Sequence, residues 1–204
     1  MRTNLPNWLG GKTAILVGDV AGLDAVAGGL ESAGSNTLRA PYVESIEDAE
    51  TAIEHVSVDV PTPLSILVHG CASPAPGNLD HNTWRTEMNA RLDSRFFYSS
   101  AFARKLIAEG RYGAILFLDE PDNAESVLQA AASGAMNNLS KTLAVEWARV
   151  GIRMNQIVSK TISGGTPEEL ASLAAMATYL CSDFAAYVTG ACVGVNDIPI
   201  HDTI

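Results

Sequence analysis

Two glycines four residues apart, Gly18 and Gly22, have a spacing that could serve a ligand. They follow the apolar run 12–18 and open a helical pattern. At such a turn glycines let the backbone approach a phosphate group, and the helix N-terminus attracts its charge. Two acids, Asp19 and Asp24, stand beside them. A carboxylate near a phosphate costs about 1 kcal/mol in water and about 4 kcal/mol at an effective dielectric constant of about 20. The sequence therefore favours a plain turn with a capped helix over a cofactor loop.

The other reactive side chains do not form a recognisable site. The four histidines lack the spacing of metal ligands, and neither a P-loop nor a G-x-S-x-G turn occurs. Glu120 could form an acid cluster with Asp119 and Asp122. A loop of solvated acids after a strand is the simpler interpretation, so we expect no metal site.

The elements that must position these residues alternate between strands and helices. Strands are predicted at 12–18, 36–40, 64–70, 112–120, 152–158 and 191–196, and helices at 23–34, 45–56, 91–110, 124–151 and 166–182. The strands are short and apolar on both faces, which is typical of a parallel sheet covered by helices on both sides. We therefore predict a single α/β domain over residues 1–204.

Charge and composition exclude several classes of partner. The net charge is −10 and the pI is near 4.7, which argues against nucleic acid, since phosphate neutralisation needs clustered Lys and Arg. No apolar run approaches 18 residues, so no membrane span is expected. The three cysteines, an odd number without a C-x-x-C pair, indicate buried free thiols in a reducing compartment. We expect a cytoplasmic protein.

Three stretches carry a resemblance to a known family. "ILVHGCA" (66–72), "LAVEWARVGIRMNQI" (143–157) and "YLCSDFAAYVTGACVGVND" (179–197) resemble segments of the short-chain dehydrogenases/reductases, and the element order is similar over nearly the whole chain. The resemblance implies a Rossmann-like, doubly wound parallel sheet. Residues 36–64 have room for one helix where the family has helix, strand, helix, so we predict a truncated fold. Pro41 stands where the family usually has the acid that holds the ribose.

The resemblance also implies where catalytic residues should stand. The family uses a tyrosine, a lysine four residues later, a serine and an asparagine. The matching positions here are Gln129, Ser133, Glu120 and Arg91, and none of the five tyrosines has a lysine four residues on. Neither Gln nor Ser titrates near neutral pH, and proton transfer of this type contributes about 10²–10⁴-fold. With Asp24 replacing the third glycine of the loop, the sequence predicts a chain that lacks catalytic residues and binds no cofactor.

The hypothesis that follows is a non-catalytic subunit in a hetero-oligomer, a heterotetramer by the family's habit. An active paralogue would hold NAD, and the resemblance implies 2-[hydroxy(phenyl)methyl]succinyl-CoA of anaerobic toluene degradation as its substrate. The long helices and the last strand would supply the interfaces. The predicted interface residues are Phe97, Ala101, Asn138, Thr142, Val145, Tyr187 and Val193.

Three alternatives remain open at this point. The chain could be a ligand-sensing or regulatory protein that reuses the cofactor cleft. It could be a true reductase whose catalytic residues have been relocated, which predicts dinucleotide binding. It could also be a homo-oligomer with a structural role.

Overall fold

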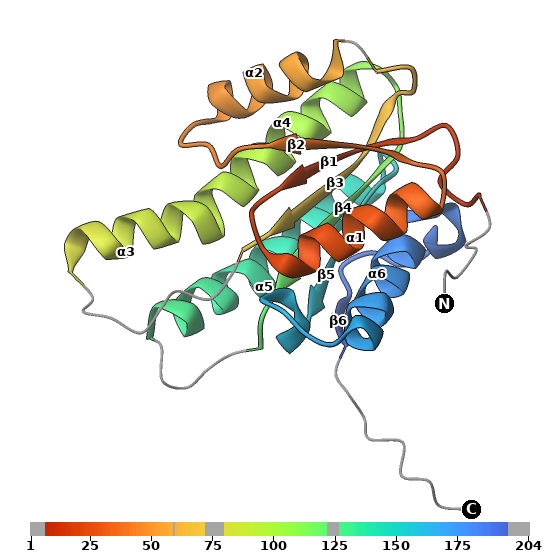
Figure 1. Cartoon of the computed structure of the whole chain (residues 1–204). Coiled ribbons are helices and arrows are strands. Elements are labelled where there is room, and N and C mark those ends of the chain that lie inside the picture. Colours follow the sequence, from red (N-terminus) through yellow and green to blue (C-terminus); the bar gives the residue numbers. More distant parts are fainter. Residues whose placement is uncertain (1–6, 59, 72–79, 122–126, 196–204) are drawn as a thin grey trace, which may run out of the picture.

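The computed structural model describes residues 7–58, 60–71, 80–121 and 127–195. In this part of the chain six parallel strands form one sheet in the order β2-β1-β3-β4-β5-β6 (Figure 1). The strands are β1 (Thr13–Val17), β2 (Asn36–Ala40), β3 (Leu64–Gly70), β4 (Gly113–Asp119), β5 (Ile152–Val158) and β6 (Cys192–Gly194). The helices are α1 (Ala21–Ser32), α2 (Ile46–Ser57), α3 (His81–Met88), α4 (Ser94–Ala108), α5 (Val127–Ala148) and α6 (Pro167–Cys181), with short turns η1 (Asn89–Asp93), η2 (Lys160–Ile162) and η3 (Asp183–Ala185). The predicted doubly wound α/β fold is confirmed.

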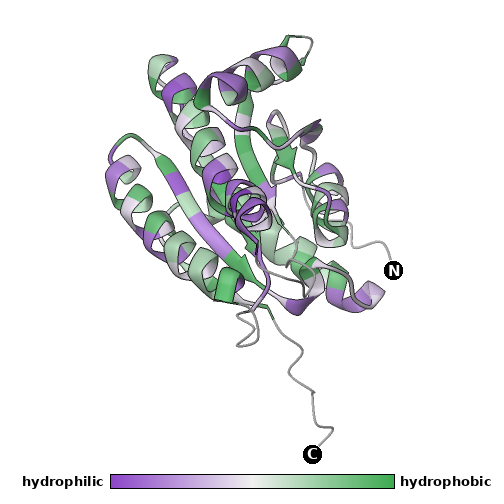
Figure 2. Cartoon of the chain, turned by 90° about the vertical axis from the view of Figure 1, so that its left-hand side faces the viewer, coloured by the Kyte–Doolittle hydropathy of each residue, from purple (hydrophilic) through white to green (hydrophobic). Residues whose placement is uncertain are grey.

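Two apolar cores lie on opposite faces of the sheet. Along β1, Ile15 and Val17 face the core shared with α2, α4 and α5, whereas Ala14 and Leu16 face the core shared with α1 and α6. This alternation follows from the period of two in a strand. Figure 2 shows hydrophilic and hydrophobic residues alternating along the helices, as expected for helices with one buried face.

The sheet is truncated at the edge formed by β2. A single helix, α2, connects β2 to β3, and the sequence prediction of only one helix there is confirmed. α2 starts at the predicted place because Ser45 Oγ accepts a hydrogen bond from the Asp48 amide at 3.1 Å. The truncation leaves β2 without a further strand beside it.

Some element boundaries differ from the prediction. The helix expected to begin at Arg91 belongs to a helical run that starts at His81, where Asp80 accepts from the Thr83 amide at 2.7 Å. The sequence gives no apolar face from which α3 could be predicted, because α3 contains no buried residue. The predicted start of the helix at 124 lies outside the described residues. Cys192 is exposed on the edge strand β6, so the prediction of three buried thiols is wrong for this one.

Within the described residues no helix is both long and apolar enough to cross a bilayer. The same part of the chain holds no group of three or more His, Cys, Asp or Glu side chains arranged as metal ligands.

Candidate functional site

The strand order reverses between β1 and β3, whose carboxyl ends lie side by side. From β1 the chain passes to β2 on one side, and β3 then pairs with β1 on the other. In open α/β sheets a ligand binds in the crevice outside the carboxyl ends at such a point. Gly18 follows β1 and Gly70 ends β3, so both residues lie at the point where the strand order reverses.

Both glycines of the turn after β1 are required by the geometry. Gly18 has φ +118°, and a Cβ atom there would lie 2.1 Å from the carbonyl oxygen of Gly70. A Cβ atom on Gly22 would lie 2.9 Å from Ile162 Cα and 2.9 Å from a methyl carbon of Leu173. The close approach of backbone segments that a dinucleotide turn needs is therefore present.

Among the described residues, the N-cap residue of α1 makes no side-chain hydrogen bond to the helix N-terminus. The N-cap residue is Val20, which offers no side-chain acceptor to the amides of the first turn. The prediction of a capped helix is therefore wrong. Asp24, one of the two acids beside the glycines, forms an ion pair with Arg39 of β2, and both side chains are exposed. Unsatisfied amides at a helix N-terminus attract anions, so this end of α1 keeps its capacity to bind a phosphate group.

Tyr42 lies across the crevice. Its hydroxyl donates to the carbonyl oxygen of Gly70 at 3.1 Å and lies 3.4 Å from Asp19 Oδ1. Burial is the main cause that raises the pKa of Tyr42 above its usual range, so the phenol stays protonated. The ring lies 5.5 Å from the ring of His69. These contacts could not be predicted from the sequence, because Tyr42 lies in the irregular segment between β2 and α2.

His69 is fully buried behind Tyr42. Its Nε2 atom lies 3.2 Å from Ser94 Oγ, and its Nδ1 atom has no hydrogen-bond partner within the described residues. Burial, followed by the charge of Arg95, lowers the pKa of His69 well below its usual value. The imidazole is therefore neutral near pH 7.

The residues predicted to replace the catalytic residues differ in their burial and in their hydrogen-bond partners. Gln129 is buried near the start of α5 and donates to the Pro121 carbonyl at 2.9 Å, which places it beside the segment that carries Glu120. Ser133 is half-buried one turn later. Arg91 is buried, with Nε 3.4 Å from a Glu87 oxygen.

The sequence did not predict the buried ionic network that lies at the carboxyl end of β4. Arg95 of α4 donates through Nη1 to both carboxylate oxygens of Asp119 at 2.7 and 2.8 Å, and Gln156 donates to Asp119 at 2.7 Å. Asp119 was predicted to be a solvated acid and is instead 6% exposed, so that interpretation is wrong. Glu120 is half-exposed, and Asp122 lies outside the described residues.

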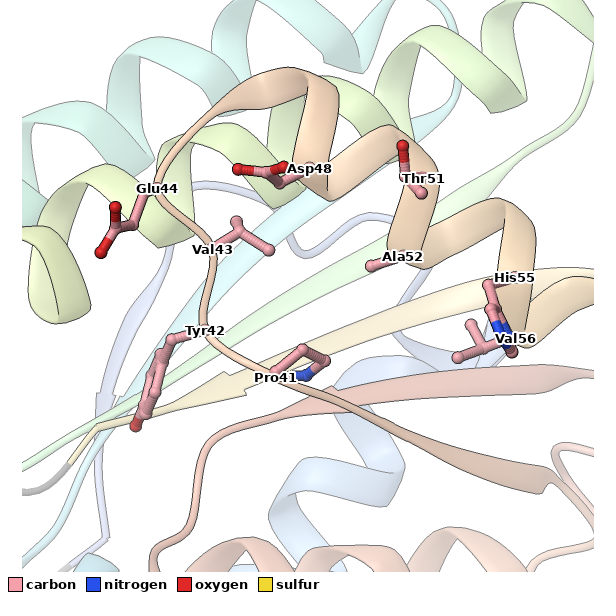
Figure 3. A pocket seen from close by; sticks show the side chains of 9 residues that line it. All are labelled: Pro41, Tyr42, Val43, Glu44, Asp48, Thr51, Ala52, His55 and Val56. Carbon is pink, nitrogen blue, oxygen red and sulfur yellow. The ribbon is translucent and has the colours of Figure 1, made fainter.

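A groove of about 630 Å³ adjoins the crevice between the segment after β2 and the helix α2. It is lined by Pro41, Tyr42, Val43, Glu44, Asp48, Thr51, Ala52, His55 and Val56 (Figure 3). Ala52 and Val56 of α2 face Pro41, and the ring of Tyr42 points away from the groove toward the end of β3. Tyr42 therefore separates the groove from the crevice.

The predicted interface residues divide into two groups. Four are exposed, and they are Asn138, Thr142, Val145 and Tyr187. Phe97 and Val193 are partly buried against the two cores, and Ala101 is only 2% exposed inside the core. Ala101 borders a groove between α2 and α4, together with Ile53 and Arg104, and its interface role stays a prediction.

Comparison with known proteins identifies relatives of one kind, although no family model matches the chain. A galactitol 2-dehydrogenase (L-tagatose-forming) of Cereibacter sphaeroides is 28% identical over 221 aligned residues, covering 92% of this chain and 84% of that protein. A probable 2,4-dienoyl-CoA reductase of Bacillus subtilis is 33% identical over 149 residues, covering 58% of each chain.

Solved structures share the fold along almost the whole chain. A short chain dehydrogenase from Mycobacterium smegmatis has a TM-score of 0.81 at 18% identity, covering 96% of this chain and 95% of the other. A gluconate 5-dehydrogenase from Burkholderia cenocepacia, solved with NADP and tartrate, has a TM-score of 0.76 at 21% identity, covering 93% and 95%.

These findings contradict the prediction of a non-catalytic subunit that binds no cofactor. The relatives are dehydrogenases and reductases by name, and a neighbour of the same fold was solved with NADP. The prediction gave too much weight to Asp24, which pairs with Arg39 and leaves the helix end open. None of these names points to the CoA substrate of toluene degradation. The chain has the Rossmann-like α/β fold of the short-chain dehydrogenases/reductases, and its relatives are dehydrogenases and reductases of that family.

Proposed function

We propose that the chain is a short-chain dehydrogenase/reductase that transfers a hydride between a nicotinamide dinucleotide and a secondary alcohol or the matching ketone. The observation that carries this proposal is the glycine turn at the strand-order reversal, with an α1 N-terminus to which the N-cap residue makes no side-chain hydrogen bond. The names of the relatives, galactitol 2-dehydrogenase among them, support a polyol or a sugar acid as the substrate class.

The residues at the turn fit the phosphate part of a dinucleotide. The backbone amides of Ala21 and Gly22 open α1 and would face the pyrophosphate. When bound, the nicotinamide ring supplies or accepts the hydride. The residues of the turn would hold and orient the dinucleotide. Asp19 would oppose the phosphate charge, but it is exposed, so water screens it.

Arg39 favours NADP over NAD. The residue directly after β2 is Pro41, where an acid would accept a hydrogen bond from a ribose hydroxyl. The guanidinium of Arg39 lies beside the first turn of α1, where its partner is the exposed carboxylate of Asp24. A nearby arginine accommodates the 2′-phosphate of NADP in this kind of fold. An exposed ion pair is worth about 1 kcal/mol or less, so a phosphate can replace Asp24.

The proton of the reaction must take a route other than a tyrosine–lysine pair. Gln129 and Ser133 have no group that titrates near neutral pH, so the proton passes through another side chain or water. Glu120 lies half-exposed directly after β4, at the carboxyl end of that strand.

The cofactor preference is tested with Arg39→Gln. We expect the unaltered chain to bind NADPH more tightly than NADH in a fluorescence titration. Arg39→Gln should weaken NADPH binding about tenfold, or about 1.4 kcal/mol, and leave NADH binding unchanged. Arg104→Gln is the matched control, because Arg104 is also an exposed arginine paired with an acid, Glu50. If the unaltered chain binds neither nucleotide at millimolar concentration, the proposed function is wrong.

We also propose that a second chain of the same fold packs on α5. Asn138, Thr142 and Val145 lie at positions i, i+4 and i+7, so they form one exposed stripe along this helix. The side chain of Val145 is 76% exposed, and an apolar side chain in such a stripe suits a helix–helix interface.

Val145→Asp tests this interface. We expect the assembly seen in a native mass spectrum to dissociate, because a buried unpaired carboxylate disfavours the contact. Val58→Asp is the matched control, since Val58 is also 76% exposed but lies at the end of α2. An assembly that survives Val145→Asp, or a chain that is monomeric from the start, contradicts the proposed interface.

A further inference from the structure

We propose that Tyr42 is a gate on the crevice between β1 and β3, and that a dinucleotide enters only after the Tyr42 side chain turns out into the neighbouring groove. The inference rests on the proposed function and adds to it a residue that sets how tightly and how fast the nucleotide binds.

The closed position of the gate follows from three contacts at the hydroxyl. Tyr42 Oη donates to the Gly70 carbonyl at 3.1 Å and lies 3.4 Å from Asp19 Oδ1. It also shares a side-chain hydrogen bond with Cys71, the residue that follows β3. The hydroxyl is therefore held between the end of β3 and the turn after β1. A dinucleotide that follows the crevice passes through this place, so ring and nucleotide cannot both occupy it.

The groove beside α2 can receive the Tyr42 ring when it leaves the crevice. Tyr42 lines the groove, and the groove volume of about 630 Å³ is within the range of sites that hold a small molecule. Its wall is formed by Pro41, Ala52 and Val56, which are apolar and suit a phenol ring. In Figure 3 the ring of Tyr42 points away from these residues, so a rotation about its Cα–Cβ bond would carry it from the crevice toward them.

A gate of this kind lowers the apparent affinity without any contact to the bound nucleotide. The apparent dissociation constant equals the intrinsic constant divided by the fraction of molecules with the gate open. Contacts that exist only in the closed position lower that fraction. The ring of Tyr42 also packs at 5.5 Å from the ring of His69, which is fully buried and adds to the closed position.

The test uses Tyr42→Phe and Tyr42→Ala in the full chain, with NADPH as the probe. Tyr42→Phe loses the hydroxyl contacts but keeps the ring, and we expect about a threefold lower dissociation constant. Tyr42→Ala removes the ring, and we expect about a tenfold lower constant. In stopped-flow measurements the gain should appear in the association rate, because the open fraction limits entry. Tyr112→Ala is the control, since that ring is 78% exposed and lies at the amino end of β4, where it borders Gly151.

The outcomes separate failure of the gate from failure of the proposed function. If Tyr42→Ala folds and binds NADPH as tightly as or more weakly than the unaltered chain, Tyr42 supports the nucleotide and the gate is wrong. If Tyr42→Ala does not fold, the same criterion applies to Tyr42→Phe. If the unaltered chain and all variants fail to bind NADPH at millimolar concentration, the proposed function fails and the gate fails with it.

Discussion

Asp119→Leu is expected to lower the free energy of unfolding by about 3–5 kcal/mol, as measured by urea denaturation. Arg95 is 1% exposed and donates to both oxygens of Asp119. Without the carboxylate, the guanidinium keeps its charge in the core, where no other acid is in hydrogen-bond contact with it among the described residues. Gln156 also loses the acceptor that it contacts at 2.7 Å. An uncompensated buried charge is among the most destabilising single changes that a fold can receive.

The double variant Arg95→Met/Asp119→Leu separates the cost of an orphaned charge from the value of the pair. Replacing both charges with apolar side chains of similar volume is often neutral, so we expect the double variant to regain most of the lost stability. Glu50→Gln is the surface control, because Glu50 and Arg104 form an exposed pair at 3.1 Å whose loss should change stability by less than about 1 kcal/mol. If the free energy of unfolding of Asp119→Leu differs from that of the unaltered protein by less than about 1 kcal/mol, the ionic network is not formed in solution.

The sheet and its helices could be predicted because their signals are local. The strands of the sheet centre are continuous apolar runs, since both faces are covered. The helix predicted at 166–182 also agrees with the observed start of α6, where Thr166 precedes Pro167 and Glu169 in a strong local pattern. The structure confirms a capping box there, with the Thr166 amide 2.6 Å from a Glu169 oxygen.

The interior of the candidate site could not be predicted, because its contacts join residues far apart in the chain. Asp119 and Arg95 are separated by 24 positions, and nothing near either one indicates the partner. Asp24 was interpreted as an obstacle to a phosphate, because the sequence does not show that the Arg39 guanidinium from β2 reaches it. Acidic side chains are usually solvated, so the sequence favoured a solvated Asp119. That interpretation failed because tertiary packing buries Asp119 against Arg95.

The function was predicted wrongly for a related reason. The prediction combined the differences from the family at Gln129 and Ser133 with those at Asp24 and Pro41, and it concluded that the chain lacks catalytic residues and binds no cofactor. In the structure the turn at Gly18 has a positive φ and closely approaches Gly70, and neither feature depends on those two side chains. Backbone conformation at a glycine is set by φ and by the neighbouring strand, which the sequence does not report directly.

Gly18→Ala is expected to lower the free energy of unfolding by about 2–6 kcal/mol and to abolish NADPH binding. Two effects add. The φ of +118° is strained for any residue with a side chain, which costs about 1–3 kcal/mol. The new Cβ atom would also lie 2.1 Å from the carbonyl oxygen of Gly70, and overpacking of this kind costs about 1–3 kcal/mol. Because Gly70 belongs to the buried strand β3, its carbonyl cannot move without disturbing the pairing of β3 with β1 and β4.

Gly28→Ala is the control for this variant, and the expected sign is opposite. Gly28 lies within α1, has no positive φ, and a Cβ atom there would meet nothing within 4 Å. Alanine at such a position reduces the freedom of the unfolded chain and should stabilise the protein by about 0.4–1 kcal/mol. NADPH binding should be unchanged, because this position faces solvent. Equal unfolding midpoints for Gly18→Ala and the unaltered chain would mean that the turn relaxes freely. In that case the close approach of Gly18 to Gly70 could not be what shapes the crevice for a nucleotide.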